Sequence, residues 1–345
     1  MKKLIFCFDG TCNNPEDIAD IEDDASISNI LKLHALLGGK LSPHNGGSTA
    51  LPHQHSFYYS GIGNRGNWLV RTINAAIAPS YGEMDDILSE AHADLQKHYT
   101  LGGQVYIFGF SRGAAIARMF AAHLTMPVKF LGVFDTVAAT LGSLDLNAET
   151  FPASDIVFEN DILAPHIEKA LHILSLDEKR LWLQPTLFNH DKRVTEVWFS
   201  GNHSDIGGGY WFDGLSDVCL QFMIANICDE LTVLSAEDLD YSVLKIPGFN
   251  EEINFDDMVI KSLINGKIHG QLYRYSHSVT HATRSVRINV NELPSTYLPI
   301  IHYSVAQRFQ QQVEYRPYAL RDVNYQVLDE EGCLTGQCYG VAGLT

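Results

Sequence analysis

The feature that most constrains the fold is an apolar segment, a glycine-flanked serine and a helical segment in direct succession. Residues 105–108 (VYIF) are typical of a buried strand, residues 109–113 (GFSRG) follow, and the small residues of 114–124 favour a helix. A strand that turns sharply into a helix, with glycines two residues on either side of a serine, is typical of a nucleophile elbow. The pattern predicts that Ser111 is a nucleophile at the carboxyl edge of a sheet, beside helix amides that favour negative charge. A tight structural turn is the alternative.

The rest of the N-terminal half alternates strand-like and helix-like segments. The apolar run 4–8 stops at Asp9-Gly10-Thr11 and is typical of a strand buried on both faces. Further strands are expected at 57–59, 130–134 and 194–199, and helices at 27–37, 84–99 and around 160–172. Such alternation indicates a parallel sheet with right-handed crossovers. We therefore expect an α/β fold, α/β-hydrolase-like, with a mostly parallel central sheet, helices on both faces and helical insertions.

Length and composition indicate a folded globular protein. The chain has 345 residues, 46% of them hydrophobic and 19% charged, which suffices for a sizeable core without metal or disulfide staples. We expect one domain over 1–345, in which the core motifs span 4–210 and residues 211–345 complete or cap the core.

Charge excludes one class of partner. The chain has 24 Lys+Arg against 41 Asp+Glu, a formal net charge of −17, and no Lys/Arg run, so sequence-independent nucleic-acid binding is not expected. Local apolar surface can still make transient membrane contact, because buried apolar area drives interfacial insertion.

Cysteine use and the amino terminus indicate the compartment. The six cysteines form no CxxC pair, and we expect free thiols. The first apolar run has five residues, fewer than the roughly 7 to 15 of a signal peptide. No apolar stretch approaches the ~20 residues of a membrane span, so synthesis in the cytoplasm, without a signal peptide or a transmembrane helix, is predicted.

A serine nucleophile needs a base, and the base needs an orienting group. Asp135 directly follows the strand after the elbow, and His203 follows the strand at 194–199. The order Ser111, Asp135, His203 is the order of α/β-hydrolases. Glycines at 201 and 207–209 favour His203 as the base, and His302 is its main competitor.

An oxyanion hole needs about two donors. One is expected to be the backbone N–H of Arg112, and the other a backbone group of the loop Gly10-Thr11 at the end of the first strand. Asp9 in that loop either takes part in the chemistry or, the reading we prefer, caps the turn.

Four motifs together resemble a known family. FCFDGTCNN, YIFGFSRGAAIAR, FLGVFDTV and VWFSGNHSDIGGGY are similar in order and content to the DUF2235 group of α/β-hydrolases, which includes Tle1-type phospholipase effectors of type VI secretion. The resemblance covers about residues 4 to 210 and extends weakly to 301–305 and 315–317. It implies an esterase with Ser111 as nucleophile, Asp135 as acid and His203 as base.

The resemblance also implies a substrate and partners. The substrate would be a lipid or another acyl ester, in effector members a glycerophospholipid, with a secretion-system or immunity protein as partner and export by a type VI-like system. The chain is short for a full effector and shows no separate C-terminal anchoring or delivery module, so antibacterial delivery is not implied by the resemblance alone. The apolar segments 151–174 and 215–234 are either helices that shield an acyl pocket or, as we prefer, core helices.

Two other functions stay open at this point. Asp9, Asp135, His203 and Asp205 could cluster at one sheet edge as the cation site of a metal-dependent phosphohydrolase, although Cys7 stands where such enzymes have their first aspartate. The chain could also be a non-catalytic lipid-binding or protein-binding module. The leading prediction, a serine esterase, requires no cofactor and no metal.

Overall fold

The computed structural model describes residues 2–10, 27–41, 51–61, 81–138, 163–180, 183–244, 253–269 and 282–345. The strands are β1 (Lys3–Phe8), β2 (Gln54–Tyr59), β3 (Gln104–Phe110), β4 (Val128–Phe134), β5 (Ala170–Ser175), β6 (Val194–Phe199), β7 (Asn289–Val290), β8 (Leu293–Pro294), β9 (Ile300–His302), β10 (Asn324–Leu328) and β11 (Cys338–Tyr339). The helices are α1 (Asn29–Leu36), α3 (Tyr81–His98), α4 (Ser111–His123), α5 (His203–Gly207), α6 (Gly214–Ala225), α7 (Phe255–Met258) and α8 (Tyr303–Gln311), with 3-10 turns at 236–238, 241–243, 318–320 and 341–344.

Within the described residues, nine strands form one sheet in the order β11-β10-β9-β6-β5-β4-β3-β1-β2. Every neighbouring pair is parallel except β10 with β11. Parallel strands end at the same edge of a sheet, so the loops after β1, β3, β4, β5 and β6 meet at one edge. The α/β fold with a mostly parallel central sheet is confirmed.

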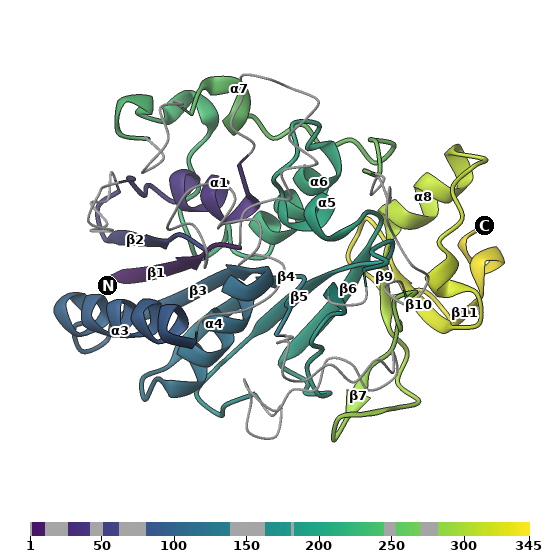
Figure 1. Cartoon of the computed structure of the whole chain (residues 1–345), viewed down its shortest axis with the longest axis horizontal. Coiled ribbons are helices and arrows are strands. Elements are labelled where there is room, and N and C mark those ends of the chain that lie inside the picture. Colours follow the sequence, from purple (N-terminus) through teal and green to yellow (C-terminus); the bar gives the residue numbers. More distant parts are fainter. Residues whose placement is uncertain are drawn as a thin grey trace.

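Helices cover both faces of the sheet. Figure 1 shows α3 and α4 on one side and α1, α5 and α6 on the other. Alternate side chains of β1 divide between the faces: Leu4, Phe6 and Phe8 pack in the cluster with α3 and α4, and Ile5 and Cys7 in the cluster with α1 and α6. This confirms the expectation that the first strand is buried on both faces.

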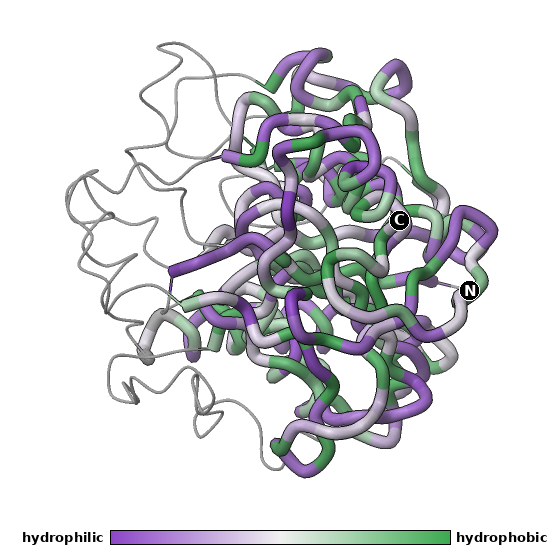
Figure 2. The backbone as a smooth tube through the Cα atoms, turned by 90° about the vertical axis from the view of Figure 1, so that its right-hand side faces the viewer, coloured by the Kyte–Doolittle hydropathy of each residue, from purple (hydrophilic) through white to green (hydrophobic). Residues whose placement is uncertain are grey.

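The ends of the chain lie at opposite ends of the long axis (Figure 1). A third apolar cluster joins the C-terminal strands β9 and β10 to α8. In the view coloured by hydropathy, hydrophobic segments run through the middle of the described part, and several outer loops are hydrophilic (Figure 2). No helix among the described residues is long and apolar enough to cross a membrane.

One helix prediction was wrong and another was too long. Where a helix was expected around 160–172, residues 163–169 contain a turn at 165–166 and an isolated bridge from Ile167 to Val128, and β5 follows. Residues 160–162 lie outside the described residues. The short apolar run ALHILS pairs with β4 and β6 and is fully buried, and periodicity cannot separate such a run from a buried helix. The helix expected over 215–234 ends at Ala225.

Candidate active site

Ser111 lies in the turn between β3 and α4. Its backbone φ is +57°, a left-handed conformation that costs a non-glycine residue free energy. The flanking glycines allow this turn: a Cβ on Gly109 would lie 2.6 Å from the Cα of Ala114, and one on Gly113 would lie 2.3 Å from the carbonyl oxygens of Phe8 and Asp9. The strand, sharp turn and helix predicted around Ser111 are present as expected.

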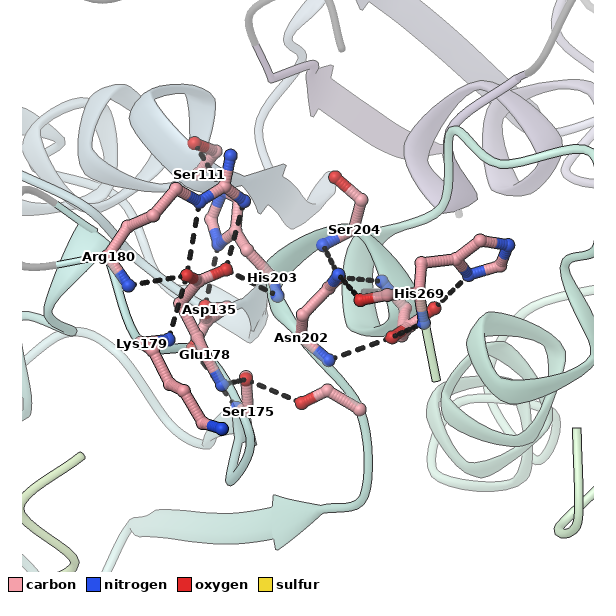
Figure 3. A network of polar contacts seen from close by, with 12 residues as sticks. Ser111, Asp135, Ser175, Glu178, Lys179, Arg180, Asn202, His203, Ser204 and His269 are labelled. Carbon is pink, nitrogen blue, oxygen red and sulfur yellow. Dashed lines mark hydrogen bonds and ion pairs between the residues drawn. The ribbon is translucent and has the colours of Figure 1, made fainter. Parts of the chain in front are cut away.

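Ser111, His203 and Asp135 form one chain of hydrogen bonds (Figure 3). The Oγ of Ser111 lies 2.8 Å from Nε2 of His203, whose Nδ1 lies 2.6 Å from Oδ2 of Asp135. A carboxylate only accepts hydrogen bonds, so Nδ1 donates to Asp135 and Nε2 is left to accept from the serine hydroxyl. All three residues are buried, and each follows a parallel strand at the same sheet edge. This arrangement can remove a proton from the serine.

The loop after β4 fixes the Asp135 backbone. Its N–H donates to the carbonyl of Ile173 at 2.7 Å, and the N–H of Ser175 donates to Oδ1 of Asp135 at 3.1 Å. The next amide, of Thr136, donates to Nε2 of His172, whose other nitrogen bonds to Glu196. The φ of Asp135, +38°, is thus held by bonds to β5.

Burial alone would raise the pKa of Asp135, but the guanidinium of Arg284 and the bond from His203 outweigh it and hold the pKa below its usual value. Arg284 donates to both carboxylate oxygens, at 3.1 and 2.7 Å. Sequence reasoning missed Arg284, because it lies in no motif and is separated from Asp135 by 149 positions.

Glu178 is a second residue that the sequence did not reveal. Its buried carboxylate accepts from the backbone N–H of His203 at 3.2 Å, from the amides of Lys179 and Arg180, and from the Arg180 side chain (Figure 3). Burial opposes ionisation of Glu178, but Arg180 and Arg284 hold its pKa well below the usual range. Glu178 therefore connects the loop after β5 to the backbone of His203.

The predicted oxyanion loop is described only as far as Gly10. A Cβ on Gly10 would lie 3.2 Å from the Cβ of Ser111, so its backbone passes close to the nucleophile. The Gly10 N–H donates to Oδ1 of Asp9 at 2.7 Å. Thr11 lies outside the described residues. Arg112 belongs to the first turn of α4, where helix amides lack intrahelical acceptors.

Asp9 bonds to its own loop and to two neighbouring elements rather than to Ser111. Its Oδ2 accepts from the hydroxyls of Ser28 and Tyr58 at 2.7 and 2.6 Å. Burial raises the pKa of Asp9 against the opposing effect of these bonds. These contacts tie the end of β1 to α1 and β2, in keeping with the turn-capping interpretation.

The other second-tier candidates bond elsewhere. Asp205 bonds to Nδ1 of His269 at 2.6 Å and caps α5 together with Asn202. His302 caps α8, bonds to Ser304 at 2.8 Å and stacks on Phe199, and burial lowers its pKa to about 3.

The residues of the metal hypothesis bond to other partners. Asp9 bonds to hydroxyls, Asp135 to Arg284 and His203, and Asp205 to His269. In the ranges that the structure describes, no group of three or more His, Cys, Asp or Glu could hold a metal ion. Of the six cysteines, the five that are described are free; Cys12 lies outside the described residues.

Comparison with known families places this geometry in context. A family model described as "T6SS, Phospholipase effector Tle1-like, catalytic domain" matches residues 2–126 and 120–226, well over half of the chain. The chain belongs to this Tle1-like family. The matched residues include Ser111, Asp135 and His203, whereas Arg284 lies beyond them.

Individual relatives share only part of their length with this Tle1-like chain. An uncharacterized protein of Saccharomyces cerevisiae is 33% identical over 135 residues, which are 36% of this chain and 17% of the yeast protein. An uncharacterized protein from Pseudomonas aeruginosa, known from its crystal structure, is 19% identical in sequence, with a TM-score of 0.41. The match covers 76% of this chain and 49% of that one. The structure of the Tle1 effector bound to the VgrG spike of the type VI secretion system is 23% identical, with a TM-score of 0.37, covering 61% and 51%.

Proposed function

We propose that the chain is a serine hydrolase of acyl esters, acting on phospholipids, with Ser111 as nucleophile, His203 as base and Asp135 as the acid that orients His203. The observation that carries the proposal is the continuous pair of bonds from Ser111 Oγ through His203 to Asp135. Phospholipids as the substrate class are supported by membership of the Tle1-like family.

The proposed reaction has two halves. The Ser111 hydroxyl gives its proton to Nε2 of His203 as Oγ attacks the ester carbonyl carbon. The tetrahedral intermediate collapses when His203 returns the proton to the departing alcohol, here a lysophospholipid, and an acyl-serine is left. A water molecule, deprotonated by His203, then attacks the acyl-serine and releases a fatty acid.

Charge on the carbonyl oxygen needs stabilisation during both halves. We assign this to the Arg112 amide in the first turn of α4 and to the backbone after β1, where Gly10 passes close to Ser111. The helix N-terminus contributes its partial positive charge. For Gly10 to take part, its N–H must leave Oδ1 of Asp9 and donate to the oxyanion instead.

Partners are proposed on the same basis. We propose transient contact with a lipid surface, because the substrate resides there, and a protein of a type VI-like secretion system as partner, because the family carries that description.

The decisive experiment is fluorophosphonate labelling of wild type and Ser111→Ala, run beside a phospholipid panel and short p-nitrophenyl esters. Ser111→Ala and His203→Ala should each lose at least about 10⁴-fold in kcat, and their double variant no more, because such residues act as a unit. Labelling together with release of fatty acid supports the whole proposal.

The chain supplies its own control. Ser304 and His302 form a second buried serine–histidine hydrogen bond, at 2.8 Å, but bond to no carboxylate that the structure describes. Ser304→Ala and His302→Ala should therefore keep near-normal turnover. Turnover of short esters alone would reject the lipid substrate, and a folded wild type that does not label would reject the serine mechanism.

A further inference from the structure

Arg284 is a buried charged residue that the mechanism above does not use. It is 2% exposed, and its two terminal nitrogens donate to both oxygens of Asp135, at 3.1 and 2.7 Å. Such a two-point contact between a planar guanidinium and a carboxylate fixes the plane of the carboxylate as well as its charge. Arg284 therefore acts directly on the group that would orient His203.

The carboxylate of Asp135 is saturated with donors. Oδ2 accepts from Nδ1 of His203 and from Arg284, and Oδ1 accepts from the amide of Ser175 and from Arg284. Burial opposes the ionised carboxylate, and Arg284 is the strongest of the influences that lower its pKa. A carboxylate that took up a proton would no longer be the full acceptor that the imidazolium of His203 needs.

Arg284 is the permanently charged cation bonded to Asp135 in the described part of the chain. Burial keeps His172 neutral by lowering its pKa and keeps Cys219 neutral by raising its pKa. Glu178, ionised, adds a second negative charge near Arg284. The ionisable side chains around Asp135 and its partners, among the described residues, are His203 on α5, His172 on β5 with Glu196 and Arg118 beside it, Cys219 on α6, Glu178 after β5 with Arg180 bonded to it, and Arg284.

The backbone around Arg284 is joined to the same site. The amide of Ala282 donates to the carbonyl of Lys179 at 2.8 Å, and Gln184 bonds to the carbonyl of Ala282. Lys179 follows Glu178, which accepts from the backbone of His203. The segment that carries Arg284 and the loop that supports His203 are thus held together, although Arg284 and Glu178 lie 106 positions apart in the sequence.

We infer that Arg284 is a positioning residue for Asp135: its two bonds hold the carboxylate toward His203, and its positive charge opposes proton uptake by the Asp135–His203 pair, which extends activity to lower pH. This inference rests on the proposed function. It also assigns to the part of the chain beyond the family match a direct role in the active site.

The test is the pH profile of kcat/KM for a p-nitrophenyl ester, and of the fluorophosphonate labelling rate, in Arg284→Gln and Arg284→Lys. The acid limb reports proton uptake by the coupled Asp135–His203 pair. Loss of the guanidinium removes a positive charge beside this pair, so the acid limb of both profiles should move to higher pH by about one unit or more, the size of effect that a neighbouring charge has. Arg284→Lys keeps the charge without the two-point contact. Its acid limb should therefore lie close to that of wild type, but the plateau of kcat/KM should be lower.

Arg308→Gln is the matched control. Arg308 is also buried, at 4% exposure, and bonds to the carbonyls of Ile264 and Gly266 rather than to Asp135. Its loss should lower stability without moving the acid limb. Circular dichroism checks that each variant is folded. If Arg284→Gln does not fold, Arg284→Lys and Arg308→Lys are each compared with wild type. A positioning role predicts that the plateau of kcat/KM is lower in Arg284→Lys and unchanged in Arg308→Lys.

A readout independent of turnover separates failure of the inference from failure of the proposed function. The Nδ1 proton of His203 in its bond to Asp135 should give a far-downfield proton resonance, absent in Asp135→Asn. In Arg284→Gln the pH-dependent change in the chemical shift of this resonance should have its midpoint at a higher pH than in wild type. Identical profiles and identical resonances in Arg284→Gln and wild type would overturn the inference, whereas lack of labelling in wild type would overturn only the proposed function.

Discussion

Ser111 combines an uncommon backbone conformation with a directed side chain. A φ of +57° costs a serine about 1–3 kcal/mol, and the surrounding structure maintains it by close packing of Gly109 and Gly113. The same turn directs Oγ to within 2.8 Å of Nε2 of His203. Strain at this residue is therefore the consequence of placing a hydroxyl at the sheet edge.

Two substitutions of Ser111 should separate strain from chemistry. Both Ser111→Gly and Ser111→Ala remove the hydroxyl and should be inactive. Glycine adopts a positive φ without the steric cost of a Cβ, so Ser111→Gly should be more stable than Ser111→Ala by about 1 kcal/mol. Urea unfolding of the two variants measures this difference. Equal stabilities, or a more stable alanine variant, would show that the turn stores no such strain.

Among the single residues of the candidate site, the sequence predicted those that stand in a motif or directly follow a strand. Ser111, Asp135 and His203 were found in this way, and the structure brings them into hydrogen-bond contact. Their catalytic roles stay a prediction. Arg284 and Glu178 could not be found, because a lone Arg or Glu acquires meaning only from long-range contacts, here across 149 positions for Arg284 and Asp135.

The turn at Ser111 between β3 and α4 depends on how closely α4 approaches β1. The Cα of Gly113 faces the carbonyl oxygens at the end of β1, and a Cβ there would lie only 2.3 Å from them. Because these oxygens belong to the backbone of Phe8, the last residue of β1, and of Asp9 after it, no side-chain rotation can relieve the clash. The glycine therefore sets the distance between the first turn of α4 and the end of β1.

Gly113→Ala should thus damage the fold and the site together. We expect a loss of about 3 kcal/mol of unfolding free energy, at the upper end of overpacking effects, together with loss of labelling at Ser111. Gly82→Ala in α3 is the control: nothing lies within 4 Å of its added Cβ, and alanine favours a helix, so stability should rise by up to about 1 kcal/mol. Thermal unfolding compares both with wild type, and an undisturbed Gly113→Ala would contradict the packing argument.

Helices and strands were predictable where the hydrophobic pattern and the flanking capping or glycine residues indicated the same element. The helix expected over 27–37 is present as α1, which Ser28 caps and after whose end Gly38, with a φ of +81°, follows. The segment 170–175 was wrongly included in a helix, because a fully buried strand has no alternation to distinguish it. The contribution of β9 and β10 to the same sheet depends on long-range pairing that no local pattern encodes.

At the scale of the whole molecule, Asp177 connects the C-terminal part of the chain to the loops after β5 and β6. Half-buried Asp177 accepts from the amide of Gly201 at 2.8 Å and from the hydroxyl of Tyr315 at 3.0 Å. Tyr315 packs in the apolar cluster that includes β9, β10 and α8. Asp177 thus joins two loops beside the candidate site to the C-terminal part of the chain.

This junction should make the stability of the whole chain depend on pH. Burial raises the pKa of Asp177 to about 6 from its ordinary 3.8, against the opposing effect of the bonds from Gly201 and Tyr315. Between these two values the folded protein retains a proton that the unfolded chain has released. Asp177 therefore contributes less to stability as pH rises through this window, and above it the ionised group destabilises the fold by roughly 3 kcal/mol.

Asp177→Asn removes this titration while its amide oxygen can still accept the same two bonds. Relative to wild type, the variant should gain roughly 3 kcal/mol in unfolding free energy between about pH 4 and pH 7. Urea unfolding at both pH values gives the difference, and Asp322→Asn, at a side chain 76% exposed, should show no comparable gain. An Asp177→Asn effect of the same size at both pH values would mean that Asp177 is not the group that couples this junction to pH.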